Sequence, residues 1–202
     1  MVVPEALPSG MRMRRILITM VFVGLISSHC AGGAFIPQEK GGKEDRDTSH
    51  YISDVPFFPQ ARYQCGPASL ASVLNYYGCR ITPEEIADAI FRRELKGTLS
   101  IDLILFAQRM GFEASAYRGT VADLQGHVAG NRPLIVFQNV GDPFLSLRHY
   151  SVVIGYDDTK GIIILHSGKH RDKVISYDRF LRSWEEMDYW TLLILPRGGV
   201  RN

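Results

Sequence analysis

"VPFFPQARYQCGPASLASVLNYYG" spans residues 55–78 and decides how the rest of the chain is organised. After Cys65, apolar side chains recur at helical spacing, at Leu70, Val73, Leu74 and Tyr77. Pro67 lies in the first turn, where its missing N–H is tolerated, and Gly78 supplies a stop signal. The pattern predicts a helix over residues 65–77 that carries a cysteine at its first position.

The segments beyond this helix change from helical to strand periodicity about halfway along the chain. Thr82 and Glu85 form a capping box around a proline and predict a helix through about Phe91. Ser100 opens a third helix, and Thr120 starts a short fourth one. Runs of β-branched and aromatic residues then predict strands, at residues 133–138, 149–156, 161–167 and 190–195. N-terminal helices packed on a C-terminal antiparallel β-sheet, an α+β fold, are therefore expected.

Composition and charge exclude two broad classes of protein. Hydrophobic residues make up 46% and charged residues 22% of the 202, so wholesale disorder is not expected. The net charge is +2, but three arginines and one glutamate lie near the N-terminus, and the remainder carries 20 basic and 20 acidic side chains. Such a balanced chain offers no broad basic face, so we expect no nucleic-acid partner.

The first 30 residues are predicted to form a targeting segment. A basic flank at residues 11–15 precedes an apolar run at residues 16–26, which is shorter than the roughly 20 residues of a membrane-spanning helix. The residues around Cys30 resemble a bacterial lipoprotein box, which implies that Cys30 is lipidated. An ordinary cleaved signal and an uncleaved anchor are the alternatives. We expect an exported protein of the periplasm or outer membrane, held there by the lipid or by the signal itself.

The remaining chain divides into a linker and one domain. Residues 31–53 are rich in glycine and charge and poor in apolar side chains, which is typical of a flexible tether. The globular domain is expected over residues 54–197.

Cys65 has three possible roles: a disulfide partner, a small core residue or a nucleophile. A disulfide to Cys79 is disfavoured, because fourteen helical residues span about 21 Å, whereas a disulfide needs Cα atoms within about 7 Å. Burial as a small hydrophobe is the common state of a free cysteine. However, the unpaired N–H groups and the dipole at a helix start stabilise a thiolate and lower the thiol pKa. We therefore favour a reactive free thiol.

The residues around Cys65 resemble a known family. Gln60 lies five residues before Cys65, in the pattern Gln-x-x-x-x-Cys-Gly-Pro. Further matches follow in order, at residues 82–83, 97–98, 107–112, 132–135 and 149–155. In these features the chain resembles the double-glycine leader peptidases, which are papain-like cysteine peptidases that process bacteriocin precursors, and especially their stand-alone exported relatives. The resemblance covers about residues 54–170 and implies a papain-like fold.

The resemblance also implies a role for each of three side chains. Cys65 would attack a peptide carbonyl and form a thioester. His149 would take the thiol proton and return it to the leaving amine. Gln60 would donate from its side-chain amide to the developing oxyanion, together with the backbone N–H of Cys65. The family prefers small residues, often Gly-Gly, before the scissile bond.

The family's third catalytic residue, an aspartate after the next strand, has no counterpart here. The sequence has His166 and Ser167 at that place. A turn at residues 157–160 would put His166 opposite Ser151 and on the face of His149, whereas a slip of one residue would bring Ser167 there instead. We therefore expect His166 to be the third member. Two further residues are alternative orienting groups, Asn139 and Asp157.

Other functions stay open at this point. The loss of the aspartate favours a non-catalytic peptide-binding lipoprotein on the same fold, and a cysteine-dependent amidase or transferase would keep the thioester and change the acceptor. Cys65, His149 and His166 would also suit a soft metal site, but no paired cysteines or helical histidines support one, so we expect neither metal nor cofactor. The expected partners are a peptide or protein substrate, the membrane through the N-terminus and a neighbouring export system.

Overall fold

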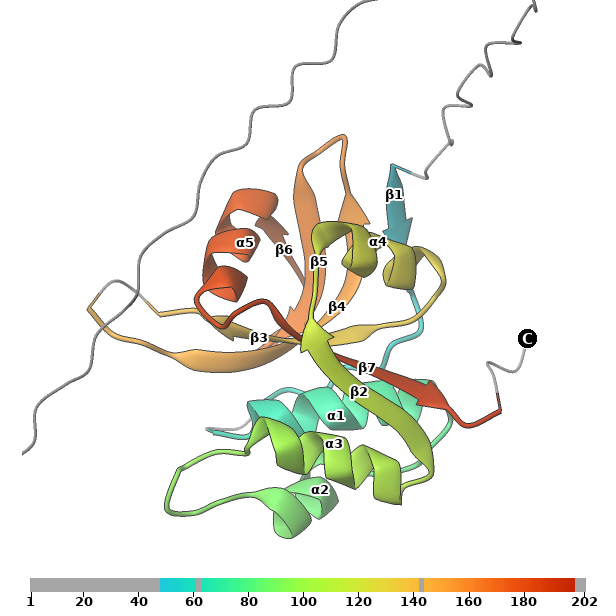
Figure 1. Ribbon diagram of the computed structural model, residues 1–202, viewed down its shortest axis with the longest axis vertical. Helices are drawn as coiled ribbons and strands as arrows, with labels where there is room; N and C mark the ends of the chain where they lie inside the picture. Colours follow the sequence, from blue (N-terminus) through green and yellow to red (C-terminus); the bar gives the residue numbers. More distant parts are fainter. Residues whose placement is uncertain (1–47, 61–62, 142–143, 199–202) are drawn as a thin grey trace, which may run out of the picture. The chain divides into compact units, whose positions relative to one another are not determined.

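The computed structural model describes residues 48–60, 63–141 and 144–198 and shows an α+β fold (Figure 1). The helices are α1 (Cys65–Tyr76), α2 (Pro83–Ile90), α3 (Ser100–Arg109), α4 (Val121–Ala129) and α5 (Tyr177–Glu185). The strands are β1 (Ser49–Tyr51), β2 (Phe112–Arg118), β3 (Leu134–Asn139), β4 (Arg148–Asp157), β5 (Ile162–Ser167), β6 (His170–Ser176) and β7 (Trp190–Pro196). None of the helices in these ranges is long and apolar enough to cross a membrane.

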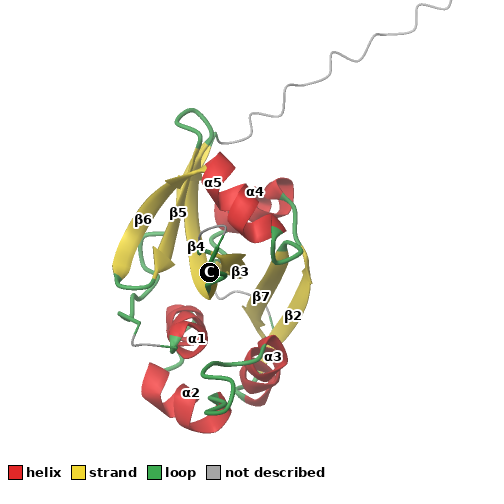
Figure 2. Ribbon diagram, turned by 90° about the vertical axis from the view of Figure 1, so that its left-hand side faces the viewer, coloured by secondary structure: helices red, strands yellow, loops and turns green. Residues whose placement is uncertain are grey.

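The strands form one antiparallel sheet with helices on both faces. Its order is β2-β7-β3-β4-β5-β6, and β1 pairs with the far end of β4. The last strand in sequence, β7, lies between β2 and β3. Figure 2 shows α1, α2 and α3 on one side of the sheet and α4 and α5 on the other. The predicted fold class is confirmed.

Local sequence signals fix the ends of some helices, and burial fixes α1. Thr82 caps α2 and Thr120 caps α4, each through a reciprocal capping box with an acidic residue three positions later. Gln64, which precedes α1, makes no side-chain cap. Residues 66–74 of α1 are instead all buried. Tertiary packing therefore positions this helix.

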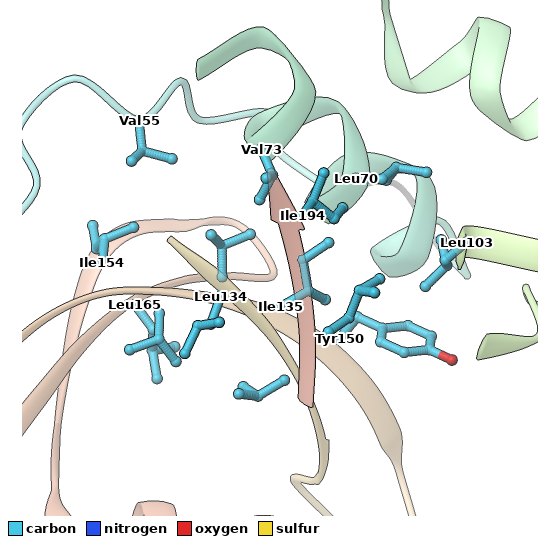
Figure 3. Packing of buried hydrophobic residues seen from close by; sticks show 14 of the residues in the cluster. Val55, Leu70, Val73, Leu103, Leu134, Ile135, Tyr150, Ile154, Leu165 and Ile194 are labelled. Atoms are coloured by element: carbon cyan, nitrogen blue, oxygen red, sulfur yellow. The ribbon is translucent and has the colours of Figure 1, made fainter. Parts of the chain in front are cut away.

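The core that holds α1 lies between the helix and the sheet. Figure 3 shows Leu70 and Val73 of α1 directed toward the same core as Ile135 of β3 and Ile194 of β7. All four side chains are fully buried. Full burial of one such side chain contributes roughly 1.5–3 kcal/mol, so the direction of α1, and with it the place of its first residue, is strongly determined.

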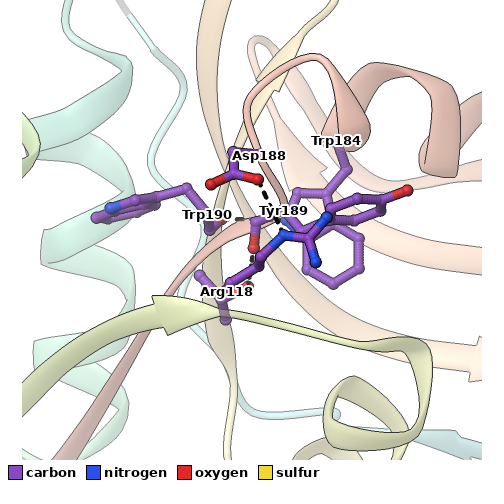
Figure 4. Close-up of polar contacts among 6 residues, drawn as sticks. Arg118, Trp184, Asp188, Tyr189 and Trp190 are labelled. Atoms are coloured by element: carbon purple, nitrogen blue, oxygen red, sulfur yellow. Dashed lines mark hydrogen bonds and ion pairs between the residues drawn. The ribbon is translucent and has the colours of Figure 1, made fainter. Parts of the chain in front are cut away.

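The far end of α5 is tied to β2 and β7 by an aromatic and charged cluster (Figure 4). The ring of Tyr189 meets that of Trp184 edge-on, with centroids 5.2 Å apart. The Arg118 guanidinium lies 4.8 Å from the centroid of the Tyr189 ring and donates to Asp188 at 2.9 Å. Trp184 Nε1 donates to the backbone carbonyl of Trp190 at 3.1 Å. These contacts hold α5 against the sheet.

The sequence patterns do not predict β1, β2, β6 or α5. Strands β2 and β6 are the two ends of the sheet order and alternate poorly between buried and exposed residues. Helix α5 buries only Phe180 and Trp184. Strand β1 falls inside the segment predicted to be a flexible tether. That prediction is wrong for residues 49–51, because these residues pair with β4 despite their polar composition. The rest of the tether and the targeting segment lie outside the described residues.

Candidate active site

Cys65 begins α1 and lies against the start of β4. Its thiol is next to the backbone of Tyr150, and backbone hydrogen bonds from Tyr150, Gly66 and Cys65 itself favour the thiolate. A Cβ at Gly66 would lie 3.1 Å from the Cβ of Thr98 and 3.4 Å from the Tyr150 ring. Glycine thus lets the helix start approach these two neighbours closely.

Cys65 lines a concavity of about 350 Å³, which we name the cysteine groove. It is lined by Tyr63, Cys65, residues 95–100, Phe137, Arg148 and Tyr150. The Tyr150 and Ser100 hydroxyls are hydrogen-bonded at 2.7 Å, and the ring of Tyr150 stacks on Phe137 with centroids 4.3 Å apart. These contacts fix the side of the groove that β3 and β4 supply.

His149 precedes Tyr150 in β4, and its ring is held by β5. His149 Nε2 lies 3.1 Å from Ser167 Oγ, and Ser151 Oγ donates to the same oxygen at 3.2 Å. Among the described residues, no hydrogen bond joins Cys65 to His149. The described connection between the two is through the backbone, since the thiol contacts Tyr150, the residue that follows His149, while the His149 ring is directed to Ser167.

Burial makes His149 a weak base that is neutral over most of the pH range. It lowers the pKa of His149 to about 4, and the positive charge of Lys173 acts in the same direction. Ser167 offers a hydroxyl but no negative charge that would stabilise an imidazolium. When Nε2–H donates to Ser167, Nδ1 keeps its lone pair and is free to accept a proton.

Burial also raises the pKa of the Cys65 thiol, and the backbone hydrogen bonds to the sulfur oppose this without reversing it. The expectation of a lowered thiol pKa at the helix start is therefore wrong in direction, because removal from water outweighs the donors. The resting site holds a neutral thiol and a neutral imidazole.

The pairing of β4 and β5 brings Ser167, and not His166, to His149. Asp157 still pairs with β5, so the turn covers residues 158–161, and a bulge between residues 153 and 155 shifts the register again. His166 then lies opposite Val152, one residue later than predicted. The predicted register is wrong, and a shift of one residue exchanges the faces of His166 and Ser167.

His166 supports the segment that leads to Gln60. Its Nε2 lies 3.0 Å from the carbonyl oxygen of Val55, and its Nδ1 accepts the N–H of Asp172 at 3.3 Å. The ring of Phe57 meets it edge-on at 5.2 Å. His166 is 3% exposed and acts as a core residue. The structure does not place it as the partner of His149.

Gln60 is joined to the end of β5 by two hydrogen bonds. Its N–H donates to the Gly168 carbonyl at 3.0 Å, and its Oε1 accepts the Gly168 N–H at 3.1 Å. The side-chain amide nitrogen has no hydrogen-bond partner within the described ranges and is free to donate. Because Gly168 follows Ser167, the structure assembles Gln60, Ser167 and His149 into one contiguous arrangement.

The two alternative orienting residues have other partners. Asn139 Oδ1 accepts the N–H groups of Leu147 and Gly141 at 2.8 and 3.2 Å, which holds the β3–β4 connection. Asp157 binds Lys160 at 2.6 Å at the opposite end of β4 from His149. Neither hydrogen-bonds to His149 in the part of the chain that the structure describes.

The two cysteines among the described residues are free thiols, as predicted. Cys65 and Cys79 are both free, so the prediction that no disulfide joins them is confirmed. Cys30, the expected lipidation site, lies outside the described residues.

Comparisons with known proteins identify similar chains. The model of a family described as Peptidase_C39 like matches residues 52–191. An uncharacterized protein of Methanothermobacter marburgensis is 34% identical over 113 residues, which are 55% of this chain and 72% of the relative.

Two solved structures share the fold. The peptidase domain of Streptococcus ComA, a bi-functional ABC transporter involved in a quorum-sensing pathway, has a TM-score of 0.59 at 23% identity and covers 71% of this chain and 99% of its own. A double-glycine-motif protease from an AMS/PCAT transporter, solved with the leader peptide, has a TM-score of 0.55 at 23% identity and covers 73% and 94%.

Alkylation by iodoacetamide tests the neutral resting state. An ordinary thiol titrates at about pH 8.5. Because burial raises the pKa of Cys65, the alkylation rate of this thiol should rise only at a higher pH than that. His149→Ala should leave this profile unchanged, since a neutral imidazole gives no charge to the thiolate. Peptide-resolved mass spectrometry measures Cys65 separately, and the protein in denaturant supplies the free-thiol reference. Fast reaction below pH 7 that is lost in His149→Ala would contradict the prediction.

Proposed function

Because the chain belongs to the Peptidase_C39 like family, we propose that it is a cysteine peptidase that cleaves its substrate through a thioester on Cys65. The observation that carries this proposal is the arrangement of Gln60, Ser167 and His149 beside the residue whose backbone contacts the thiol. A nucleophile, a base with an oriented ring and a free amide donor are the parts that acyl transfer needs.

The proposed reaction starts from the neutral pair. Nδ1 of His149 accepts the thiol proton as the Cys65 sulfur bonds to the peptide carbonyl carbon. This contact forms when substrate is bound, as catalytic hydrogen bonds are often long without it. The carbon–nitrogen bond then breaks, and the imidazolium gives its proton to the leaving amine. Water next attacks the thioester, with His149 again as base, and the carbon–sulfur bond breaks to regenerate the thiol.

Gln60 supports the oxyanion in this scheme. With Oε1 fixed on Gly168, the side-chain NH₂ is left to donate to the negative oxygen, together with the N–H of Cys65 at the helix start. In this proposal both donors are held before the reaction, Gln60 by Gly168 and the N–H by the helix start, so little reorganisation would be needed as charge develops.

We further propose small residues before the scissile bond. The double-glycine motif in the name of the transporter protease of similar fold supports the same specificity.

A second candidate is a peptide-binding module without catalysis. It is favoured by the neutral thiol, by Ser167 in place of a carboxylate and by the missing Cys65–His149 hydrogen bond in the described structure. Such a module would bind peptides and release them unchanged.

Cleavage of synthetic peptides that contain Gly-Gly, followed by mass spectrometry, tests the peptidase proposal. Cys65→Ala should abolish cleavage. Gln60→Glu keeps an acceptor for Gly168 but replaces the donor with a negative oxygen, so kcat should fall about 10²–10³-fold. Gln108→Glu, on the exposed face of α3, should have no effect. Cleavage that survives in Cys65→Ala would refute the proposal, and binding without cleavage in the wild type would favour the second candidate.

Ser167→Asp tests the electrostatics of the base. A carboxylate at this position stabilises the imidazolium and raises the pKa of His149 from its value of about 4. The acid limb of the kcat/KM profile should therefore move from about pH 4 toward neutral pH. Ser115→Asp, exposed on β2, is the matched control and should leave the limb in place. An acid limb that stays put in Ser167→Asp would exclude His149 as the group that titrates.

Export and lipid anchoring are also part of the proposal, on the sequence of the first 30 residues. Metabolic labelling with a fatty-acid analogue should modify the protein in a bacterial host, and Cys30→Ala should remove the label. Equal labelling of the two proteins would exclude Cys30 as the lipidated residue.

A further inference from the structure

A second concavity, of about 750 Å³, shares none of its described lining residues with the cysteine groove. We name it the basic groove and define it by Asn139, Ser167, Lys173, Arg179, Arg182 and Glu186. Its volume is within the range of ligand-binding pockets. Ser167, which hydrogen-bonds to His149, forms part of its wall.

The charges in this groove are predominantly positive. Lys173 comes from β6, and Arg179 and Arg182 come from one face of α5. None of the three forms an ion pair with another described residue. Among the described lining residues the one carboxylate is that of Glu186, which already accepts a hydrogen bond from Asn139 Nδ2.

The three cations line one concavity, and Arg179 is close enough to Lys173 for their charges to repel each other. Lys173 is partly buried, and both this burial and the nearby charge of Arg179 lower its pKa. Such an arrangement disfavours the empty groove and favours any ligand that brings negative charge. An anion that is bound there would form charge-assisted hydrogen bonds with Lys173 and the two guanidinium groups.

The position of His149 relates this groove to one end of a substrate. In the proposed reaction, His149 protonates the leaving amine, so the segment after the scissile bond must leave on the side of its ring. That ring is directed to Ser167 and the basic groove, whereas its neighbours in β4, Arg148 and Tyr150, line the cysteine groove.

We propose that the basic groove binds carboxylates of the segment that follows the scissile bond, so the substrates are peptides with acidic residues just after the cleavage point. This assignment rests on the proposed function. The carboxylates come from glutamate and aspartate side chains or from the terminal carboxylate of a short leaving segment.

A bound carboxylate would also act on the base. Two causes lower the pKa of His149: burial, which is the larger, and the positive charge of Lys173. A substrate carboxylate beside Lys173 offsets this charge and supplies the negative field that the Ser167 hydroxyl does not. Acidic substrates would then make His149 a stronger base than it is in the substrate-free protein, in addition to binding more tightly.

Binding without turnover tests the groove. Full-length Cys65→Ala is titrated into two fluorescein-labelled, C-terminally amidated peptides, Gly-Gly-Ala-Glu-Asp-Glu and its isosteric amide Gly-Gly-Ala-Gln-Asn-Gln, and fluorescence anisotropy gives each Kd. The acidic peptide should bind about tenfold more tightly, as expected for charge-assisted contacts. The added pair Lys173→Gln and Arg182→Gln should reduce the preference to less than about threefold. Arg80→Gln, an exposed arginine outside the groove, should leave it intact.

The outcomes separate the two proposals. Equal affinity for the two peptides, or a preference that survives the double substitution, overturns the groove assignment, even if the wild type cleaves peptides. A preference that disappears with the double substitution supports the assignment, even if the wild type proves inactive. A third peptide is Gly-Gly-Ala-Gln-Asn-Gln with a free C-terminal carboxylate. Tighter binding than that of its amidated form identifies the terminal carboxylate as a ligand, and equal binding assigns the preference to the acidic side chains.

Discussion

Burial of α1 against β3 and β4 is the constraint on which the candidate site depends. The helix has no side-chain cap at Gln64, and residues 66–74 are buried throughout, so packing alone holds its first residue at the start of β4. The same burial takes the Cys65 thiol out of water and raises its pKa. Position and reactivity are therefore opposed at this residue, because the packing that places the sulfur also keeps it protonated. A base that is neutral at the start of the reaction suits such a thiol, and burial of His149 provides one.

The second determinant is the register of β4 and β5. Relative to the prediction, this register exchanges the faces of His166 and Ser167. The Ser167 hydroxyl therefore contacts the His149 ring, while His166 contacts the carbonyl of Val55 in the segment that leads to Gln60. No negative group of the described chain then stabilises the imidazolium, and Lys173 acts against it. In the proposed reaction, the missing charge has to come from outside the chain. An acidic substrate in the basic groove would provide it, which joins specificity to base strength.

The sequence predicts the elements whose signals are local. Capping boxes at Thr82 and Thr120 mark α2 and α4, and Pro67 and Gly78 bound α1 closely. Gln60 and His149 are proposed from the family resemblance, and the structure joins them to consecutive residues at the end of β5, Gly168 and Ser167. The register of β4 and β5, however, depends on a bulge in β4, which the sequence analysis does not predict. The bulge lies between Val153 and Gly155, and a Cβ at Gly155 would lie 2.9 Å from the His50 carbonyl oxygen of β1. The wrong third residue therefore follows from the bulge, whereas β1 is not predicted because its segment is polar.

The basic groove has the same kind of origin. Outside the N-terminal segment, acidic and basic residues balance, so composition gives no sign of a local positive site. The groove exists because Trp184, Tyr189 and Arg118 dock α5 on the sheet, and that docking brings Arg179 and Arg182 near Lys173 of β6. Two buried aromatic residues of α5 thus position the charges on its other face. Helix α5, which the sequence analysis does not predict although Ser176 caps it and its apolar residues recur at helical spacing, supplies the chemistry that would select the substrate.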